Sequence, residues 1–244
     1  MTLVFNSEGH VYQWLEEPET KLTSVSTLIG MYHEKFDSDK IAEKYSKKVG
    51  KTKEEVLDDW RATNQKSIIL GSSYHQRRED EYLSKSNVHK HSEVAGVKQA
   101  FDITELKPGV YPELIVYHPK YNIVGTADYV EIFSDNTFIL KDWKTSKKLD
   151  FVGFPVYNPK THQREPKKMY APLNHMPDCN GSHYSIQLSS YSWMLEEAGY
   201  ECKEIILEHV LFDEELNDIM VVEYPINYLK KEVKNLFEHF KLRQ

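Results

Sequence analysis

The stretch GTADYVEIFSDNTFILKDWKTS, residues 125–146, decides the fold, because it predicts a β-hairpin that carries two carboxylates and a lysine. β-Branched and aromatic residues fill positions 124–133 and 137–143, and the Ser-Asp-Asn between them favours a turn. Alternate side chains of a strand share one face, so Asp142 and Lys144 should point the same way, about 7 Å apart. If the strands pair about this turn, Asp128 comes close to Asp142.

This trio of side chains is typical of a metal-dependent phosphodiesterase. Two carboxylates at one place repel each other unless a cation or a shared proton lies between them. Mg²⁺ commonly takes one or two carboxylates together with water and substrate phosphate. A neighbouring lysine such as Lys144 can hold an attacking water or meet charge that develops on a phosphate. Each residue alone is more often part of a charged hairpin that faces water, so the prediction depends on the combination.

The hairpin pattern resembles the PD-(D/E)XK nuclease superfamily. The proline of that name is absent, and Ala127 precedes the first aspartate. The RecB-like exonuclease branch instead has Gly-x-x-Asp, which matches Gly125 and Asp128, followed by Asp-aromatic-Lys-Thr, which matches residues 142–145. That branch includes single-domain exonucleases of phages, CRISPR systems and mitochondrial genome maintenance.

Two further motifs of the same branch occur in the order that the resemblance requires. A Gly-x-x-x-His-x-x-x-Glu motif precedes the catalytic sheet on a helix, and Gly71, His75 and Glu79 match it. A Gln-x-x-x-Tyr motif follows on a later helix, and Gln187 and Tyr191 match it. Taken alone, the first pair is more typical of a surface His–Glu contact, and the second is unremarkable helical periodicity.

The resemblance implies an α+β fold with an αβββαβ core, a mixed sheet flanked by helices. It covers about residues 66–212, within one nuclease domain that adds an N-terminal hairpin and helices (1–65) and a C-terminal strand and helix (213–244). It implies Mg²⁺ or Mn²⁺ as cofactor and DNA as partner. The metal ligands that it implies are His75, Asp128, Asp142 and the carbonyl of Trp143. Lys144 would orient or deprotonate the water, and Gln187 and Tyr191 would position the DNA strand.

Two acidic residues are further candidates for this site. The branch often places a carboxylate at the start of the strand before the hairpin, where Glu113 stands, and Glu79 follows His75 by one helical turn. An exposed structural role is an equal alternative for Glu113.

The segment 147–182 reads as a long irregular loop, which is usually functional or partly disordered. It is locally basic in a chain of net charge −7, so a nucleic-acid surface is expected here rather than over the whole protein. Its substrate-binding candidates are Lys147, Lys148, Lys167 and Lys168. The aromatic residues that could stack on unpaired bases are Phe151, Phe154, Tyr157 and Tyr170.

The same segment carries a competing zinc pattern. His175, Cys179 and His183 are spaced by four residues, and His162 lies nearby. These are zinc-ligating residue types, although structural zinc motifs normally show paired close spacings.

Local patterns predict the remaining elements. We expect a hairpin over 3–14, short helices over 23–48 capped by Ser24 or Ser26 and by Asp37 or Ser38, and a helix that a capping box begins at Thr52. Further helices are expected over 66–83, 94–101, 183–197 and 226–242, and strands over 113–117, 203–212 and 219–223.

These patterns together predict a metal-dependent exonuclease that acts on the ends of single-stranded DNA in repair, recombination or replication. The alternatives are a structure-specific or restriction-type endonuclease, and a DNA-binding module of nuclease ancestry that no longer cleaves. The two cysteines and the lack of a signal-peptide pattern or long apolar run favour a cytoplasmic protein that contacts no membrane, including a phage protein in its host.

Overall fold

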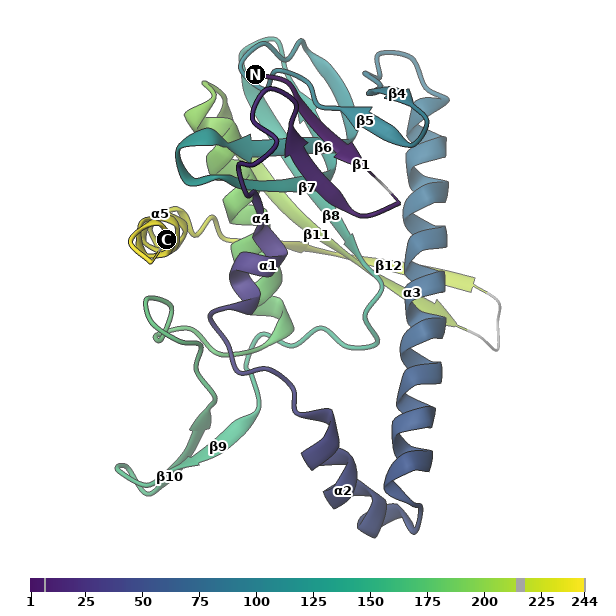
Figure 1. The fold of residues 1–244 in the computed structure, drawn as a ribbon, viewed down its shortest axis with the longest axis vertical. Coiled ribbons are helices and arrows are strands. Elements are labelled where there is room, and N and C mark those ends of the chain that lie inside the picture. The colour runs from purple at the N-terminus through teal and green to yellow at the C-terminus, as the bar shows by residue number, and fades with distance from the viewer. Residues whose placement is uncertain (7, 214–217, 244) are drawn as a thin grey trace.

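The computed structural model describes residues 1–6, 8–213 and 218–243. It is an α+β fold built on a mixed six-stranded sheet in the order β12-β11-β8-β7-β3, with β6 also paired to β7 (Figure 1). The strands of this sheet are β3 (Thr23–Ser24), β6 (Gly109–His118), β7 (Ile123–Ile132), β8 (Thr137–Lys144), β11 (Glu201–Asp213) and β12 (Asp218–Pro225).

The hairpin predicted at residues 125–146 is present as β7 and β8, in antiparallel register from Ile132–Phe138 to Tyr129–Lys141. At its turn, the Asp135 carboxylate accepts hydrogen bonds from the backbone and hydroxyl of Thr137, which is the local bonding expected of a turn aspartate. β11 runs parallel to β8, and a parallel neighbour needs a crossover connection, which α4 (Asn180–Glu197) supplies. The order α3 (Lys53–Leu83), β6, β7, β8, α4, β11 therefore contains the expected αβββαβ succession. Two short strands are inserted before β6, and two more are inserted before α4.

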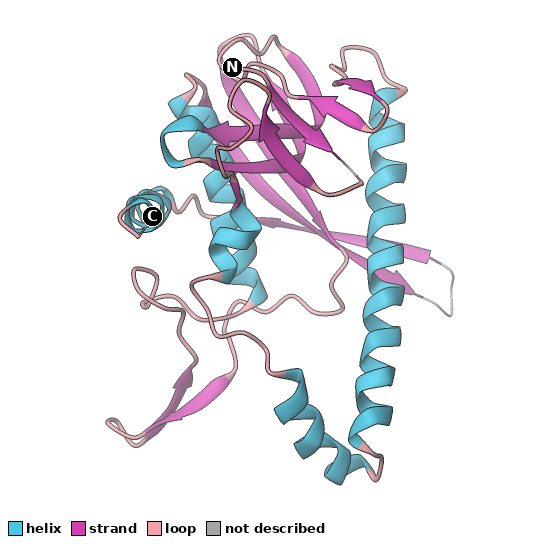
Figure 2. Cartoon of the chain, viewed as in Figure 1, coloured by secondary structure: helices cyan, strands magenta, loops and turns pink. Residues whose placement is uncertain are grey.

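Helices cover both faces of the sheet. α3 (Lys53–Leu83) runs along one face, and α4 with α5 (Lys230–Lys241) covers the other (Figures 1 and 2). Strand alternation supplies both interfaces, because Val130 and Leu140 join the core around α4 while Tyr129 and Trp143 pack with Tyr74 of α3.

α3 is one helix of 31 residues, whereas two separate helices were expected. The predicted capping box is present, since the Thr52 hydroxyl accepts from the Glu55 backbone and the Glu55 carboxylate accepts from the Thr52 backbone. No proline interrupts residues 61–66, so the two predicted pieces join. α1 (Val25–Gly30) and α2 (Ser38–Val49) are capped by Ser24 and Asp37, as predicted.

The prediction of a helix over 94–101 is wrong, because this region forms the strands β4 (Ser92–Val94) and β5 (Val97–Gln99). Ala95 and Gly96 between them both have positive φ, at 51° and 76°, which is typical of a tight two-residue hairpin turn. β5 then pairs with β1 (Leu3–Asn6), which pairs with β2 (Val11–Trp14), to make a second sheet that includes the predicted N-terminal hairpin.

The segment 147–182 is less irregular than predicted. It contains a β-hairpin, β9 (Pro155–Asn158) and β10 (Gln163–Pro166), and α4 begins three residues before the expected start at 183. This hairpin and the α2–α3 corner both extend beyond the same end of the sheet, at the bottom of the view in Figure 1. Within the described ranges, no helix has the length and apolar composition to cross a bilayer.

Candidate functional site

The two carboxylates of the central hairpin meet where its ladder ends. The last described pair is Tyr129–Lys141, and the next positions are Asp128 and Asp142. Here the Asp128 Oδ2 accepts a hydrogen bond from the backbone N–H of Trp143 at 2.7 Å. A side-chain carboxylate thus takes the place of a backbone carbonyl of the neighbouring strand as the hydrogen-bond acceptor. Both carboxyls are buried, with 6% and 1% of each residue exposed. Burial first, and the charge of Asp142 second, raise the pKa of Asp128 well above its ordinary value.

Asp142 is bound by the lysine two residues further along its strand. The Lys144 ammonium lies 2.6 Å from Asp142 Oδ2, while Oδ1 is buried without a hydrogen-bond partner among the described residues. Burial alone would lower the pKa of Lys144, but the charges of Asp142 and Asp128 outweigh it and raise the pKa above the usual range. Lys144 is therefore a cation, and its ammonium also lies 5.1 Å from the ring centroid of Tyr184.

His75 of α3 completes the cluster from the opposite side. Its Nδ1 lies 3.6 Å from Asp128 Oδ1 and 3.7 Å from Glu113 Oε1, and its Nε2 lies 3.0 Å from the carbonyl oxygen of Trp143. Donor atoms of His75, Glu113 and Asp128 all fall within 4.8 Å of one another. Three carboxylates and one imidazole, one carboxylate oxygen being buried and unpaired, suit a hard divalent cation.

Glu113 reaches the cluster through an irregular backbone. Its φ is +53° in the middle of β6, and the ladder to β7 passes from Pro112–Tyr129 to Leu114–Ala127 without it. A left-handed non-glycine residue inside a strand is strained and often marks a functional position. Pro112 is the sequence feature that could have located this interruption, because proline inside a strand indicates a bulge or edge.

The pKa of His75 sets an expected pH dependence for metal binding. Burial disfavours the imidazolium, but the nearby carboxylates of Glu113 and Asp128 outweigh it and raise the pKa to about 9. A cation must therefore displace at least one proton at neutral pH, so Mn²⁺ affinity should rise about tenfold per pH unit from pH 7 to 8 and level off above pH 9. Electron paramagnetic resonance of free Mn²⁺ measures this. His75→Asn should flatten the rise, and a pH-independent wild-type affinity would contradict the assignment of His75.

An added Cβ would clash severely at Gly125 and would make a tight contact at Gly71, the two motif glycines. A Cβ on Gly125 would fall 2.4 Å from Tyr191 Cε1, and one on Gly71 would fall 3.0 Å from Thr145 Oγ1. The Tyr191 ring therefore packs directly on β7, and its hydroxyl accepts a hydrogen bond from Gln187 Nε2 at 2.9 Å. Tyr191 is buried, so Gln187 is the member of this predicted pair that is more accessible to a DNA strand. Tyr184, whose ring lies near the Lys144 ammonium, is a site residue that the sequence analysis missed. Its position one turn before Gln187 was the available indication.

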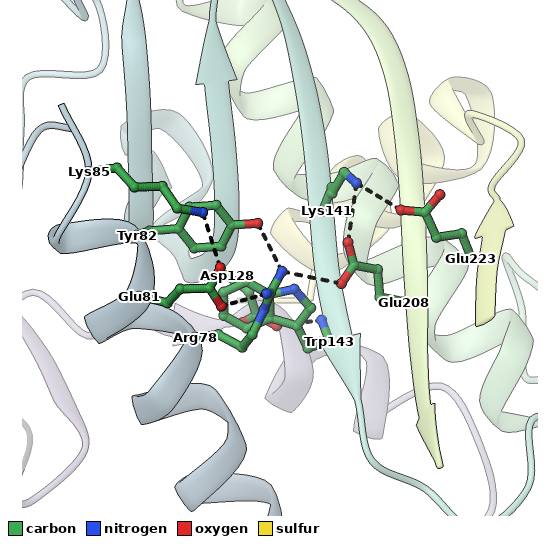
Figure 3. A network of polar contacts seen from close by, with 9 residues as sticks. All are labelled: Arg78, Glu81, Tyr82, Lys85, Asp128, Lys141, Trp143, Glu208 and Glu223. Carbon is green, nitrogen blue, oxygen red and sulfur yellow. Dashed lines mark hydrogen bonds and ion pairs between the residues drawn. The ribbon is translucent and has the colours of Figure 1, made fainter. Parts of the chain in front are cut away.

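A polar and aromatic network behind the site anchors α3 to the sheet (Figure 3). The Arg78 guanidinium lies 5.5 Å from the fully buried Trp143 ring and donates to the Tyr82 hydroxyl at 2.9 Å. The same guanidinium lies 3.8 Å from buried Glu208, which Lys141 also contacts at 3.2 Å. Arg78 follows His75 by about one turn of α3. The network therefore fixes how far along β8 the His75 side chain meets Trp143.

Four adjoining hollows form a groove along α3, here called the α3 groove. Their volumes are about 390, 420, 500 and 610 Å³, and neighbours share lining residues. The groove begins at Glu79 and Lys98, which form an ion pair of 3.2 Å, and passes His75 and Lys144. It ends at the aromatic residues of the α2–α3 corner, which are Phe36 and Trp60.

The four predicted substrate lysines divide into two pairs. Lys147 is exposed and lines three of the hollows, and Lys148 is exposed beside it. Lys167 is held between Glu34 at 2.9 Å and Asp178 at 3.1 Å, and Lys168 donates to the carbonyl of His175. The geometry thus places Lys147 on the α3 groove, with Lys148 exposed next to it, whereas Lys167 and Lys168 are engaged elsewhere.

The aromatic residues of segment 147–182 are also divided. A Cβ on Gly181 would fall 2.5 Å from the Phe151 ring, so this ring packs on α4. Phe151 nevertheless remains 42% exposed, and Phe154, Tyr157 and Tyr170 are more exposed still.

The zinc set read from the sequence is not assembled. His175 Nε2 faces Glu232 at 3.4 Å, Cys179 contacts Ser182, and His162 contacts Tyr157. Four-residue spacing places side chains together only on a helix, and α4 begins after Cys179. Of these residues, His183 is the one that the described part of the chain brings into a possible metal group, with different partners.

Comparison with known proteins adds little to this geometry. No protein-family model matches the chain, and no curated protein matches it. Among solved structures, the chain is similar to the "Crystal structure of SSO0001", with 16% sequence identity and a TM-score of 0.38. The alignment covers 92% of this chain and 77% of that chain, and a likeness of this strength carries no argument about function.

Proposed function

We propose that this protein is a metal-dependent deoxyribonuclease of the PD-(D/E)XK superfamily, acting as an exonuclease on single-stranded DNA. The observation that carries the proposal is the convergence of His75, Glu113 and Asp128 beside the Asp142–Lys144 pair. These groups come from three separate parts of the chain and meet at one end of the hairpin.

The side chains have distinct roles in the proposed hydrolysis. Asp128, Glu113, His75 and Asp142 would hold Mg²⁺ or Mn²⁺, with the carbonyl of Trp143 beside them. Such a cation, when bound, supplies Lewis-acid stabilisation of the phosphate and a lower pKa for water. Lys144 is protonated beside the carboxylates, so it is suited to donate to a phosphate oxygen or hold the attacking water rather than to act at once as a base.

The α3 groove supports a nucleic-acid substrate in an otherwise acidic protein. It passes the candidate site, Lys147 faces it, and the rings of Phe36 and Trp60 lie at one end with centroids 5.8 Å apart. An exposed Phe36, a half-buried Trp60 and a cation along a groove suit unpaired bases and a phosphate backbone without sequence preference.

Trp60→Ala should weaken binding of short single-stranded DNA in Ca²⁺ by about 1–3 kcal/mol, as expected for loss of one stacked base. Lys147→Ala should instead lower the slope of log affinity against log salt by about 0.7, because it removes one phosphate contact. Fluorescence anisotropy at several salt concentrations separates the two effects. Tyr157→Ala, on the β9–β10 hairpin, serves as the matched variant. If Tyr157→Ala weakens binding and Trp60→Ala does not, the DNA strand follows segment 147–182 and not the α3 groove.

Linear and circular single-stranded DNA test the proposed function directly. With Mg²⁺, linear DNA should be shortened stepwise while circles of the same sequence survive, and chelation should stop the reaction. Circles cut as fast as linear strands would make the protein an endonuclease on the same site. Tight binding without cleavage of either, in Mg²⁺ and in Mn²⁺, would identify a non-cleaving module.

A further inference from the structure

A second group of possible metal ligands lies outside the candidate site. It consists of His33 in the connection between α1 and α2, Asp178 just before α4, and His183 in the first turns of α4. His183 Nε2 lies 3.0 Å from Asp178 Oδ1, and His33 Nδ1 lies 3.9 Å from the same oxygen. All three donor atoms fall within 4.8 Å of one another.

The packing around these residues points their donor atoms at one spot. The two imidazole rings are stacked, with centroids 4.4 Å apart and planes at 28°, and one nitrogen of each ring lies near Asp178 Oδ1; one ring must turn for both nitrogens to bind the same ion. Lys167 binds the other oxygen of Asp178 at 3.1 Å, which leaves Oδ1 shared by the two histidines. The Asp178 side chain is 7% exposed, and its histidine partners are 26% and 22% exposed, so the group is accessible to an ion but largely shielded.

The ligand types indicate which ion fits. Two imidazoles and one carboxylate suit zinc and its neighbours, whereas Mg²⁺ and Ca²⁺ prefer oxygen. Zinc bonds of 2.0–2.1 Å in a tetrahedron place ligand atoms about 3.3 Å apart. Distances of 3.0 and 3.9 Å lie on either side of that value, and His33 would turn to exchange the contact of its Nδ1 with the carbonyl of Glu34, at 3.1 Å, for the ion.

We propose that His33, Asp178 and His183 form a site for a Zn²⁺-type ion, with the fourth position of the tetrahedron left to water. The ion would join three segments that meet at the base of the β9–β10 hairpin: the α1–α2 connection, the loop before α4, and α4 itself. This site shares no residue with the candidate catalytic cluster, so it stands whether or not the protein cleaves DNA.

The test measures metal content and Co²⁺ spectra on the full chain without a histidine tag. His75→Ala serves as the parent, because it removes the imidazole of the other cluster. After incubation with Zn²⁺ and dialysis, the parent should retain one ion per chain, and Co²⁺ should give visible bands of a tetrahedral complex that millimolar Mg²⁺ does not abolish. Zn²⁺ should also raise the thermal midpoint, and chelation should reverse this.

The deciding comparison uses single substitutions in that parent. His33→Ala and His183→Ala should each lose the retained ion and the Co²⁺ bands, while His175→Ala, an exposed histidine nearby, should keep both. His33 is partly exposed, so its loss should leave the fold intact by circular dichroism. A parent that retains no ion, or an ion that survives in both His33→Ala and His183→Ala, overturns the proposal.

Discussion

Asp142→Asn should reduce Mg²⁺-dependent DNA cleavage by at least about a thousandfold while the folded protein keeps nearly its wild-type stability. Asparagine preserves the shape of a side chain that is almost fully buried, and its amide oxygen can still accept from Lys144. It also removes a negative charge that is close to Asp128, so the free energy of unfolding should change by no more than about 1 kcal/mol. Initial cleavage rates and urea denaturation of the same preparation measure the two quantities.

Lys144→Ala is the companion variant, because a lysine is not a metal ligand. It should lose cleavage as Asp142→Asn does but still bind Mn²⁺, whereas Asp142→Asn should bind Mn²⁺ more weakly. Glu79→Gln is the matched control: Glu79 lies in the same groove but pairs with Lys98, so this variant should retain most of the cleavage rate. Near wild-type cleavage by either Asp142→Asn or Lys144→Ala, in protein free of host nuclease, would exclude the proposed site.

Gly125→Ala should destabilise the protein by about 1–3 kcal/mol and impair cleavage together. The added Cβ would lie 2.4 Å from the Tyr191 ring, a buried group that cannot swing into solvent. Either β7 or α4 must move, and β7 carries Asp128 while α4 carries Tyr184 above Lys144. Chemical denaturation gives the loss of stability, and Mn²⁺ affinity reports any displacement of Asp128.

Gly30→Ala is the control for that substitution, since a Cβ there meets nothing within 4 Å and its backbone is not left-handed. It should leave stability within about 0.5 kcal/mol and cleavage unchanged. If Gly125→Ala and Tyr191→Phe both match the wild type, Tyr191 does not constrain β7 as the contact implies. A stable Gly125→Ala protein that has lost cleavage would instead show that the site tolerates less displacement than the fold.

The elements that could be predicted from sequence are those specified by local chemistry. The β7–β8 hairpin follows from alternating side chains and a turn aspartate, and the caps at Ser24, Asp37 and Thr52 follow from single side-chain hydrogen bonds. β4 and β5 were misread because each has three residues, and their pairing with β1 is a contact between distant parts of the chain.

The same distinction explains the candidate site. Asp128, Asp142 and Lys144 belong to one hairpin, so sequence reasoning could place them together. The approach of Glu113 depends on a left-handed residue in β6, and the height of His75 depends on Arg78 packing against Trp143. No rule of sequence spacing predicts either of these contacts. The ion pairs of Lys167 with Glu34 and Asp178 could not be predicted from the sequence either. Glu34 belongs to the connection after α1, which approaches Lys167 only in the folded chain.

The peptide groups of Trp143 have a consequence for folding. Its N–H donates a hydrogen bond to Asp128, and its carbonyl oxygen lies 3.0 Å from His75 Nε2. Both backbone groups of Trp143 therefore contact candidate metal ligands. A slip of β8 by one residue would turn every side chain of that strand to the opposite face and carry the aspartate away from the cluster. A divalent ion should therefore bind only the correctly aligned hairpin and stabilise that alignment by mass action. Metal binding would then favour the correct strand alignment during folding, in addition to its proposed role in catalysis.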